Sequence, residues 1–192
     1  MSPHRPLTRL ATAGVAGHVF FELAAGVGMP FASVVGPVPA ATGWGVAGAA
    51  TWRAAGRSSP SADVVLTVAN GVGLAAVVAH LAGWPRRRTR LGWPWLADCE
   101  GLGPELMPLY NPIVQLSGIA ALGGLLRENR AAPRWLGWTA LGLVPVLVRV
   151  QHAEHRRLVR QARTRPGWWN RRLRPIGGIA VSHGNGWARQ DP

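Results

Sequence analysis

The pair His18 and Glu22 combines residue types that could do chemistry inside an apolar stretch. The two residues are four apart, so on a helix they share one face, and no other ionisable side chain lies between Leu10 and Val35. A carboxylate at the middle of a bilayer costs about 3 kcal/mol or more unless it is neutral, paired or wetted. A glutamate that keeps its proton there could act as a general acid or a proton relay. A structural bundle would instead use the same pair to fix the register between helices.

Other polar residues lie near the ends of apolar stretches or in the segments between them. The predicted catalytic residues are Glu22, His18, Glu100 and Glu105, and the predicted ligand-binding residues are Asn70, His80, Tyr110, Asn111 and Gln115. Most of them fall toward one end of the predicted helices, where they could line a cavity together with His18. Ordinary roles compete, because an amide such as Asn70 often bonds one helix to another. A tyrosine such as Tyr110 is also common at the membrane surface.

Motifs for metal, phosphate or covalent chemistry are not found, and we predict no metal site and no cofactor. The two histidines of the segment His152–His155 are three residues apart, which is not the spacing that places two histidines and a catalytic glutamate on one helix face. Cys99 is the sole cysteine, so an internal disulfide is excluded. The sequence also lacks a phosphate-binding glycine loop within a strand–helix setting and a GxSxG nucleophile turn.

The elements that must position these residues follow from the segregation of charge along the 192-residue chain. Charge-free runs extend from Leu23 to Trp52, from Val64 to Pro85 and from Leu106 to Leu126. A helix in a soluble domain carries charges every few residues on its wet face, and about 20 apolar residues suffice to cross a bilayer. We therefore expect an all-α, polytopic integral membrane bundle. Its approximately four transmembrane helices are predicted at residues 10–35, 64–84, 109–126 and 135–150.

The remaining segments are short, basic or interrupted by proline. Gly36–Pro60 opens with two prolines and is rich in glycine and alanine, which favours an interfacial segment between the first two spans. Residues 152–165 predict a basic cytoplasmic helix that closes a domain of residues 1–165, and residues 166–192 predict a disordered basic tail. A signal peptide is the alternative for the first span, and Glu22 within its apolar core argues against it.

Arginine supplies all 21 basic residues and most of the formal net charge of +13. The arginines flank apolar runs instead of forming one stripe, which argues against nucleic acid as a partner. If four helices cross the membrane, one side receives Arg5, Arg9, the Arg86–Arg90 cluster and the basic tail. The positive-inside rule then predicts a multi-pass protein of the cell membrane, N-in and C-in. Membrane lipid is the expected partner, with anionic headgroups at the basic C-terminal helix, and a homo-oligomer stays open.

Three classes of function are compatible with this reading. The leading hypothesis is a non-enzymatic bundle that binds a lipid or a partner, because no catalytic motif is present. The first alternative is a membrane-embedded enzyme of isomerase or cyclase type, which would act on a lipid-like substrate by proton transfer with Glu22 as the acid. The second alternative is a small transporter or proton pathway, which the few spans and the lack of an internal repeat disfavour.

Overall fold

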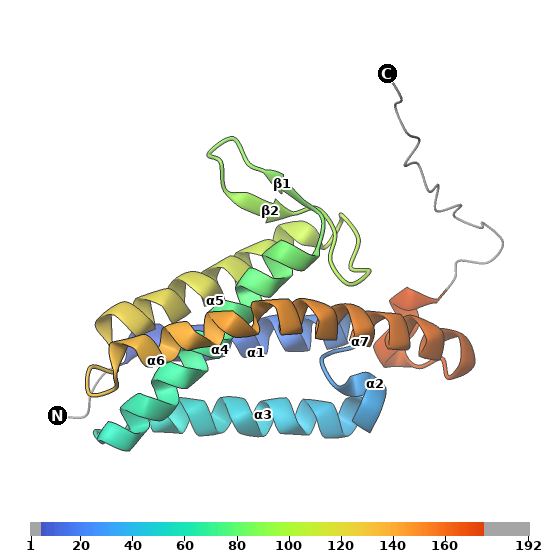
Figure 1. Cartoon of the computed structure of the whole chain (residues 1–192). Coiled ribbons are helices and arrows are strands. Elements are labelled where there is room, and N and C mark those ends of the chain that lie inside the picture. Colours follow the sequence, from blue (N-terminus) through green and yellow to red (C-terminus); the bar gives the residue numbers. More distant parts are fainter. Residues whose placement is uncertain (1–4, 175–192) are drawn as a thin grey trace.

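The computed structural model describes residues 5–174, which form a mostly helical bundle (Figure 1). The α-helices are α1 (Pro6–Ala25), α2 (Ala32–Val35), α3 (Pro37–Ala54), α4 (Pro60–Gly83), α5 (Met107–Arg127), α6 (Arg134–Thr139) and α7 (Val144–Thr164). Two 3₁₀ helices, η1 (Ala140–Leu143) and η2 (Trp168–Leu173), precede and follow α7. Strands β1 (Arg86–Arg88) and β2 (Pro94–Leu96) pair antiparallel between α4 and α5. Because this hairpin is the whole sheet content of residues 5–174, the predicted all-α class is confirmed.

Within these residues, two helices are long and apolar enough to cross a membrane. They are α4, with a mean hydropathy of 2.0, and α5, with a mean hydropathy of 1.3. They coincide with the predicted spans 64–84 and 109–126. The structure therefore supports the coarser part of the predicted architecture, a helical chain with two membrane-competent helices. The further crossings belong to a proposal made below.

Prolines occupy the first turn of the long helices. A proline lies at one of the first two positions of α1, α3, α4, α5 and α7. It is tolerated there because first-turn N–H groups have no partner inside the helix. Pro145 is such a residue at the start of α7, directly after η1. The segment 135–150 is thus divided among α6, η1 and α7, and α7 continues through the segment predicted as a basic helix.

Helix α3 changes the predicted path of the chain. Gly36 ends α2 with a φ of 91°, a left-handed value that glycine adopts freely, and Pro37 then begins α3. The two prolines of this segment start a helix instead of preventing one. The 18 residues of α3 span about 27 Å at the usual rise, and Figure 1 shows α3 running back along the bundle to the start of α4.

This return of α3 places the starts of α1 and α4 at the same end of the bundle, where the Arg5 guanidinium pairs with the Asp63 carboxylate. At the other end, Glu22 of α1 lies 3.8 Å from His80 of α4. Helices α1 and α4 therefore run parallel, and Arg5 and the Arg86–Arg90 cluster lie at opposite ends. The prediction that Arg5 and the Arg86–Arg90 cluster lie on the same side of the membrane is therefore not supported. The predicted N-in and C-in orientation depended on that grouping and is not supported either.

Small residues allow the helices to approach closely. A Cβ atom on Gly14 of α1 would lie 2.6 Å from the Cβ atom of Ser117 on α5, so a larger side chain at Gly14 would push these helices apart. Ala75 and Ala79 of α4 and Ala121 of α5 are likewise buried. Close contact through small residues is how helices associate where lipid removes the hydrophobic drive between them.

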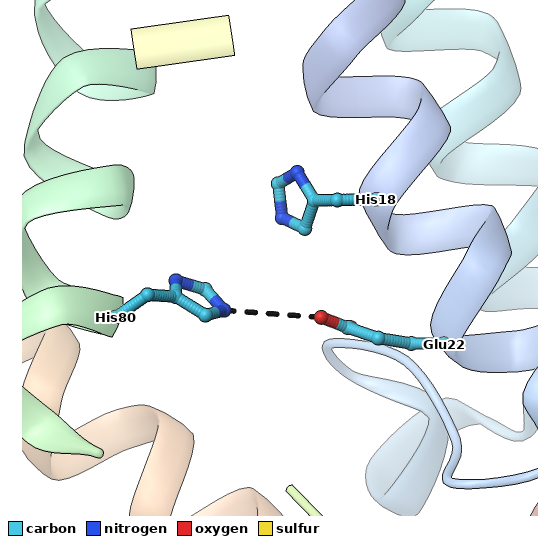
Figure 2. A group of neighbouring side chains, drawn as sticks. All are labelled: His18, Glu22 and His80. Carbon is cyan, nitrogen blue, oxygen red and sulfur yellow. Dashed lines mark ion pairs between the residues drawn. The ribbon is translucent and has the colours of Figure 1, made fainter. Parts of the chain in front are cut away.

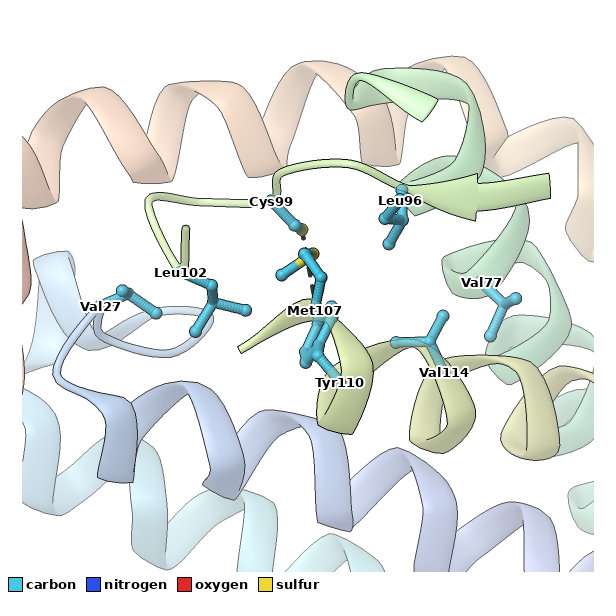
Figure 3. Packing of buried hydrophobic residues seen from close by; sticks show 8 residues of the cluster. All are labelled: Val27, Val77, Leu96, Cys99, Leu102, Met107, Tyr110 and Val114. Atoms are coloured by element: carbon cyan, nitrogen blue, oxygen red, sulfur yellow. Dashed lines mark hydrogen bonds between the residues drawn. The ribbon is translucent and has the colours of Figure 1, made fainter. Parts of the chain in front are cut away.

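The main hydrophobic cluster lies where α1 and α4 end and α5 begins (Figure 3). Its buried members are Val27, Val77, Leu96, Cys99, Leu102, Met107, Tyr110 and Val114. Cys99 and Leu102 come from the segment between β2 and α5, so this irregular segment folds against the bundle. It forms a cover over the ends of the helices.

Helix η2 lies within the segment predicted as a disordered tail, and the structure corrects that prediction for residues 168–173. Asn170 is fully buried, and the backbone N–H of Arg172 donates a hydrogen bond of 3.0 Å to the carbonyl of Gly26. These contacts fix η2 beside the end of α1. Residues 175–192, the rest of the predicted tail, lie outside the described residues.

Candidate functional site

His18 and Glu22 of α1 face His80 of α4 (Figure 2). The shared face that their four-residue spacing predicts is present. The centroids of the two imidazole rings are 5.4 Å apart, and the rings meet edge to face at 77°. All three residues are buried, with exposed fractions of 4% for His18, 1% for Glu22 and 8% for His80.

His80 has one ring nitrogen engaged with its own helix. Nδ1 lies 2.9 Å from the carbonyl oxygen of Ala76, one turn earlier. A carbonyl can only accept, so Nδ1 carries a proton, and Nε2 is the nitrogen that faces Glu22 at 3.8 Å. Within residues 5–174, neither Nε2 of His80 nor Nδ1 of His18 has a hydrogen-bond partner. A buried polar atom without a partner costs about 1–3 kcal/mol, which points to a ligand that these residues do not themselves supply.

Tyr110, near the start of α5, is the fourth member of this group. Its phenol is fully buried and donates a hydrogen bond to Oε1 of Glu22. Its ring centroid lies 6.4 Å from that of each histidine. The sequence suggested either a ligand-binding residue or a membrane-surface tyrosine, and the structure places Tyr110 in the core. His18, Glu22, His80 and Tyr110 are called the histidine cluster below.

Cys99 and Glu100 cover the histidine cluster from the segment between β2 and α5. The Cys99 sulfur lies 4.0 Å from the Tyr110 hydroxyl (Figure 3), and Glu100 is 9% exposed. Burial raises the pKa of the Cys99 thiol well above its usual value. Burial, reinforced by the neighbouring Glu22 carboxylate, raises the pKa of Glu100 to about 8, so Glu100 holds its proton at neutral pH.

Asn111 and Gln115, which were predicted to bind a ligand, instead hold the hairpin against α5. The Asn111 side chain accepts from the backbone N–H of Leu96 at 2.8 Å and donates to its carbonyl at 3.0 Å. The Gln115 amide donates to the carbonyl of Pro94 at 2.9 Å. Both side chains bond to the backbone of the hairpin and so position the cover over the histidine cluster.

Asn70 and Glu105 lie apart from the histidine cluster. Asn70 donates a hydrogen bond of 2.9 Å to the Thr8 hydroxyl at the opposite end of α1. The Glu105 carboxylate pairs with Arg172 of η2 and is exposed. Of the predicted site residues, the structure brings His18, Glu22, His80, Tyr110 and Glu100 together. It adds Cys99, for which a lone cysteine in an irregular segment gave no sequence signal.

A second buried polar group joins the starts of α1 and α4 to the end of α5. This N-terminal polar cluster consists of Arg5, Thr8, Asp63, Asn70 and Glu128. Arg5 pairs with Asp63 and also donates to the carbonyls of Ala54, Ala55 and Arg57. The other Asp63 oxygen accepts from the backbone N–H of Ala131 at 2.8 Å. These contacts close the bundle at this end.

The histidine cluster has the donor atoms that a metal ion requires. One nitrogen from each of His18 and His80 and one carboxylate oxygen of Glu22 lie within 4.8 Å of one another. A second set, formed by His80, Cys99 and Glu100, meets the same distance criterion and shares His80 with the first. Chemically, the arrangement can hold a small cation or exchange protons among its side chains. No family model, curated protein or solved structure matches this chain, so the functional argument depends on the geometry of the site.

Proposed function

We propose that this chain is an integral membrane protein whose bundle presents a buried polar binding site, the histidine cluster, near one membrane surface. The observation that supports the proposal is the pair of ring nitrogens, on His18 and His80, that have no partner among residues 5–174. A bundle that used these side chains only for packing would gain stability from pairing them or from replacing them with apolar residues.

Embedding in the membrane is supported by the outer surfaces of α4 and α5. Large apolar side chains are exposed along both helices, among them Val65 and Val72 of α4 and Leu116 and Ile119 of α5. A soluble bundle places polar residues on such outer faces, whereas lipid solvates apolar ones. In the proposal, α1, α3 and the α6–α7 segment also cross the membrane beside these two helices, because α1 and α4 run parallel and α3 returns the chain between them.

The proposed orientation follows from the two ends of the bundle. The end with the histidine cluster carries Arg86–Arg90 and the basic last turns of α7, and a hollow of about 310 Å³ at the hairpin is lined partly by Arg86, Arg87 and Arg88. The positive-inside rule places this richer end in the cytoplasm, in contact with anionic headgroups. The start of α1 then lies on the opposite side of the membrane.

Binding is favoured over proton transfer with Glu22 as the acid. A general acid must carry the proton that it delivers. Tyr110 donates its hydroxyl proton toward Oε1 of Glu22, so this carboxylate oxygen acts as an acceptor. Acceptance suits a carboxylate that binds a cation.

The binding role is tested by comparing two buried polar residues. We expect His18→Leu to leave the Tm of the detergent-solubilised, chelator-stripped protein unchanged or higher, because the change removes an unpartnered nitrogen. The matched control, Asn70→Leu, should lower the Tm, because Asn70 is equally buried and bonded to Thr8. A loss for His18→Leu as large as that for Asn70→Leu would assign the histidine cluster a structural role and contradict the proposal.

The orientation is tested with exposed single cysteines and a membrane-impermeant maleimide on intact cells. Cys99 is fully buried and should not react. We expect Ser58→Cys, near the start of α4, to be labelled from outside, and Leu91→Cys, at the hairpin, to be labelled only after lysis. The reverse pattern would invert the orientation, and labelling of both from outside would contradict the crossing of α4.

A further inference from the structure

We infer that the histidine cluster binds a divalent first-row transition-metal ion, with nitrogens of His18 and His80 and the carboxylate of Glu22 as its ligands. The inference rests on the proposed function and names the ligand of that site. The side chains of Glu22 and His80 are 1% and 11% exposed, and His18 is 4% exposed. Within residues 5–174, one ring nitrogen of each histidine has no hydrogen-bond partner.

The spacing of the donor atoms fits an ion between them. Ligands at the usual zinc–nitrogen and zinc–oxygen distances are separated by about 3.4 Å in a tetrahedral site. Nε2 of His80 and Oε1 of Glu22 are already 3.8 Å apart, and all three donors fall within 4.8 Å. Small rotations of side chains are enough to complete the coordination, without movement of α1 or α4.

Two neighbouring groups orient the ligands as second-shell groups do in known metal sites. The carbonyl of Ala76 holds the proton of His80 on Nδ1 and so fixes Nε2 as the coordinating atom. The Tyr110 hydroxyl occupies one lone pair of the Glu22 carboxylate and fixes its plane. Tyr110 is thus a positioning residue, and the three ligands stand on the rigid helices α1 and α4.

The alternative set of His80, Cys99 and Glu100 is less suited to hold the ion. His80 has one nitrogen available, because Nδ1 is engaged with Ala76, so the two sets cannot each bind an ion through it. Cys99 and Glu100 stand on the covering segment, and Glu100 has a φ of 53° in the left-handed region. We therefore assign the ion to the donors on the helices.

The chemistry of the donors selects the class of metal. Imidazole nitrogens suit zinc and iron, whereas magnesium and calcium prefer a full set of oxygen ligands. Two histidines and one glutamate form a set that binds zinc with one position left open. The same combination holds ferrous iron in a facial arrangement. Both ions share this donor chemistry, and metal analysis of the purified protein distinguishes them.

The test uses the full-length protein, purified in detergent and stripped with a chelator. We expect the wild type to bind Co²⁺ and Zn²⁺ at one ion per chain, with visible cobalt bands and a rise in Tm. His18→Gln and His80→Gln should each abolish binding, and Tyr110→Phe should weaken it by about tenfold. His152→Gln is the matched control, because His152 packs on Trp84 outside the donor set and should bind as the wild type does.

Three results would overturn the inference. If a folded, monodisperse wild type binds no metal ion, the metal-binding inference is wrong. The proposed binding site is still tested separately, by comparing the Tm of His18→Leu with that of Asn70→Leu. A near-ultraviolet thiolate-to-cobalt band that Cys99→Ser abolishes would move the ion to the alternative set. Loss of binding in His152→Gln would exclude the assigned ligands. The wild-type cobalt spectrum decides the donor type even if a variant fails to fold.

Discussion

The two buried polar clusters of this bundle lie at opposite ends of α1 and differ in how completely their groups are paired. In the N-terminal polar cluster, Arg5 and Asp63 are bonded to each other and to surrounding backbone. In the histidine cluster, two ring nitrogens have no partner in the part of the chain that the structure describes. Both clusters are buried and both join α1 to α4, so they differ in the pairing of their own members more than in residue type. At the N-terminal end, Oδ1 of Asn129, whose amide nitrogen donates to Thr8, also has no partner among residues 5–174.

The position of each cluster along its helices explains the difference. The N-terminal polar cluster lies where helices begin and end, and the free N–H and C=O groups of helix termini are at hand. Glu128, for example, accepts the backbone N–H groups of Leu7 and Thr8 at 2.9 Å each. His18, Glu22 and His80 lie inside helices, where the backbone N–H and C=O groups are already paired with one another. The hydrogen-bond partners left for these three side chains are therefore mainly one another.

The largest effect is expected for Asp63→Ala, which would leave the Arg5 guanidinium buried without its carboxylate. Breaking a buried pair in this way costs about 3–5 kcal/mol of unfolding free energy. Thermal unfolding in detergent, followed by circular dichroism, measures the loss. The matched control is Glu105→Ala, which removes an exposed pair with Arg172 and should leave the Tm nearly unchanged. Equal small effects of the two changes would contradict a structural role for the N-terminal polar cluster.

An intermediate effect is expected at Glu128, which caps the start of α1 from a distant part of the chain. Glu128→Ala removes the acceptor for two first-turn N–H groups and the Thr8 hydroxyl, and should cost about 1–2 kcal/mol. Glu128→Gln keeps an acceptor oxygen and loses only the charge, so it should cost less. Urea or thermal denaturation orders the variants, and a greater loss for glutamine than for alanine would contradict the capping role.

The sequence predicted the elements of the histidine cluster better than the path that assembles them. The spacing of His18 and Glu22 and the placement of His80, Tyr110 and Glu100 near helix ends depend on local pattern, and the structure brings these residues together. The return of α3 was missed because the prolines after Gly36 resemble a helix break as much as a helix start. The decisive contact, Arg5 with Asp63, joins residues 58 positions apart, and no single-sequence pattern records such a pair.

The smallest effect is expected on the pH dependence of the Tm, at His155 of α7. This residue lies next to the histidine cluster and is not a member of it. Burial lowers the pKa of His155 below the ordinary 6.5, although Asp98 opposes the shift and His152 and Arg156 add to it. The unfolded chain therefore takes up this proton first as pH falls, and stability is lost below about pH 6.5. We expect His155→Gln to reduce the fall in Tm between pH 7.5 and pH 5.5. An unchanged pH profile would show that His155 is freely solvated, and the covering segment would then leave α7 open to water at that point.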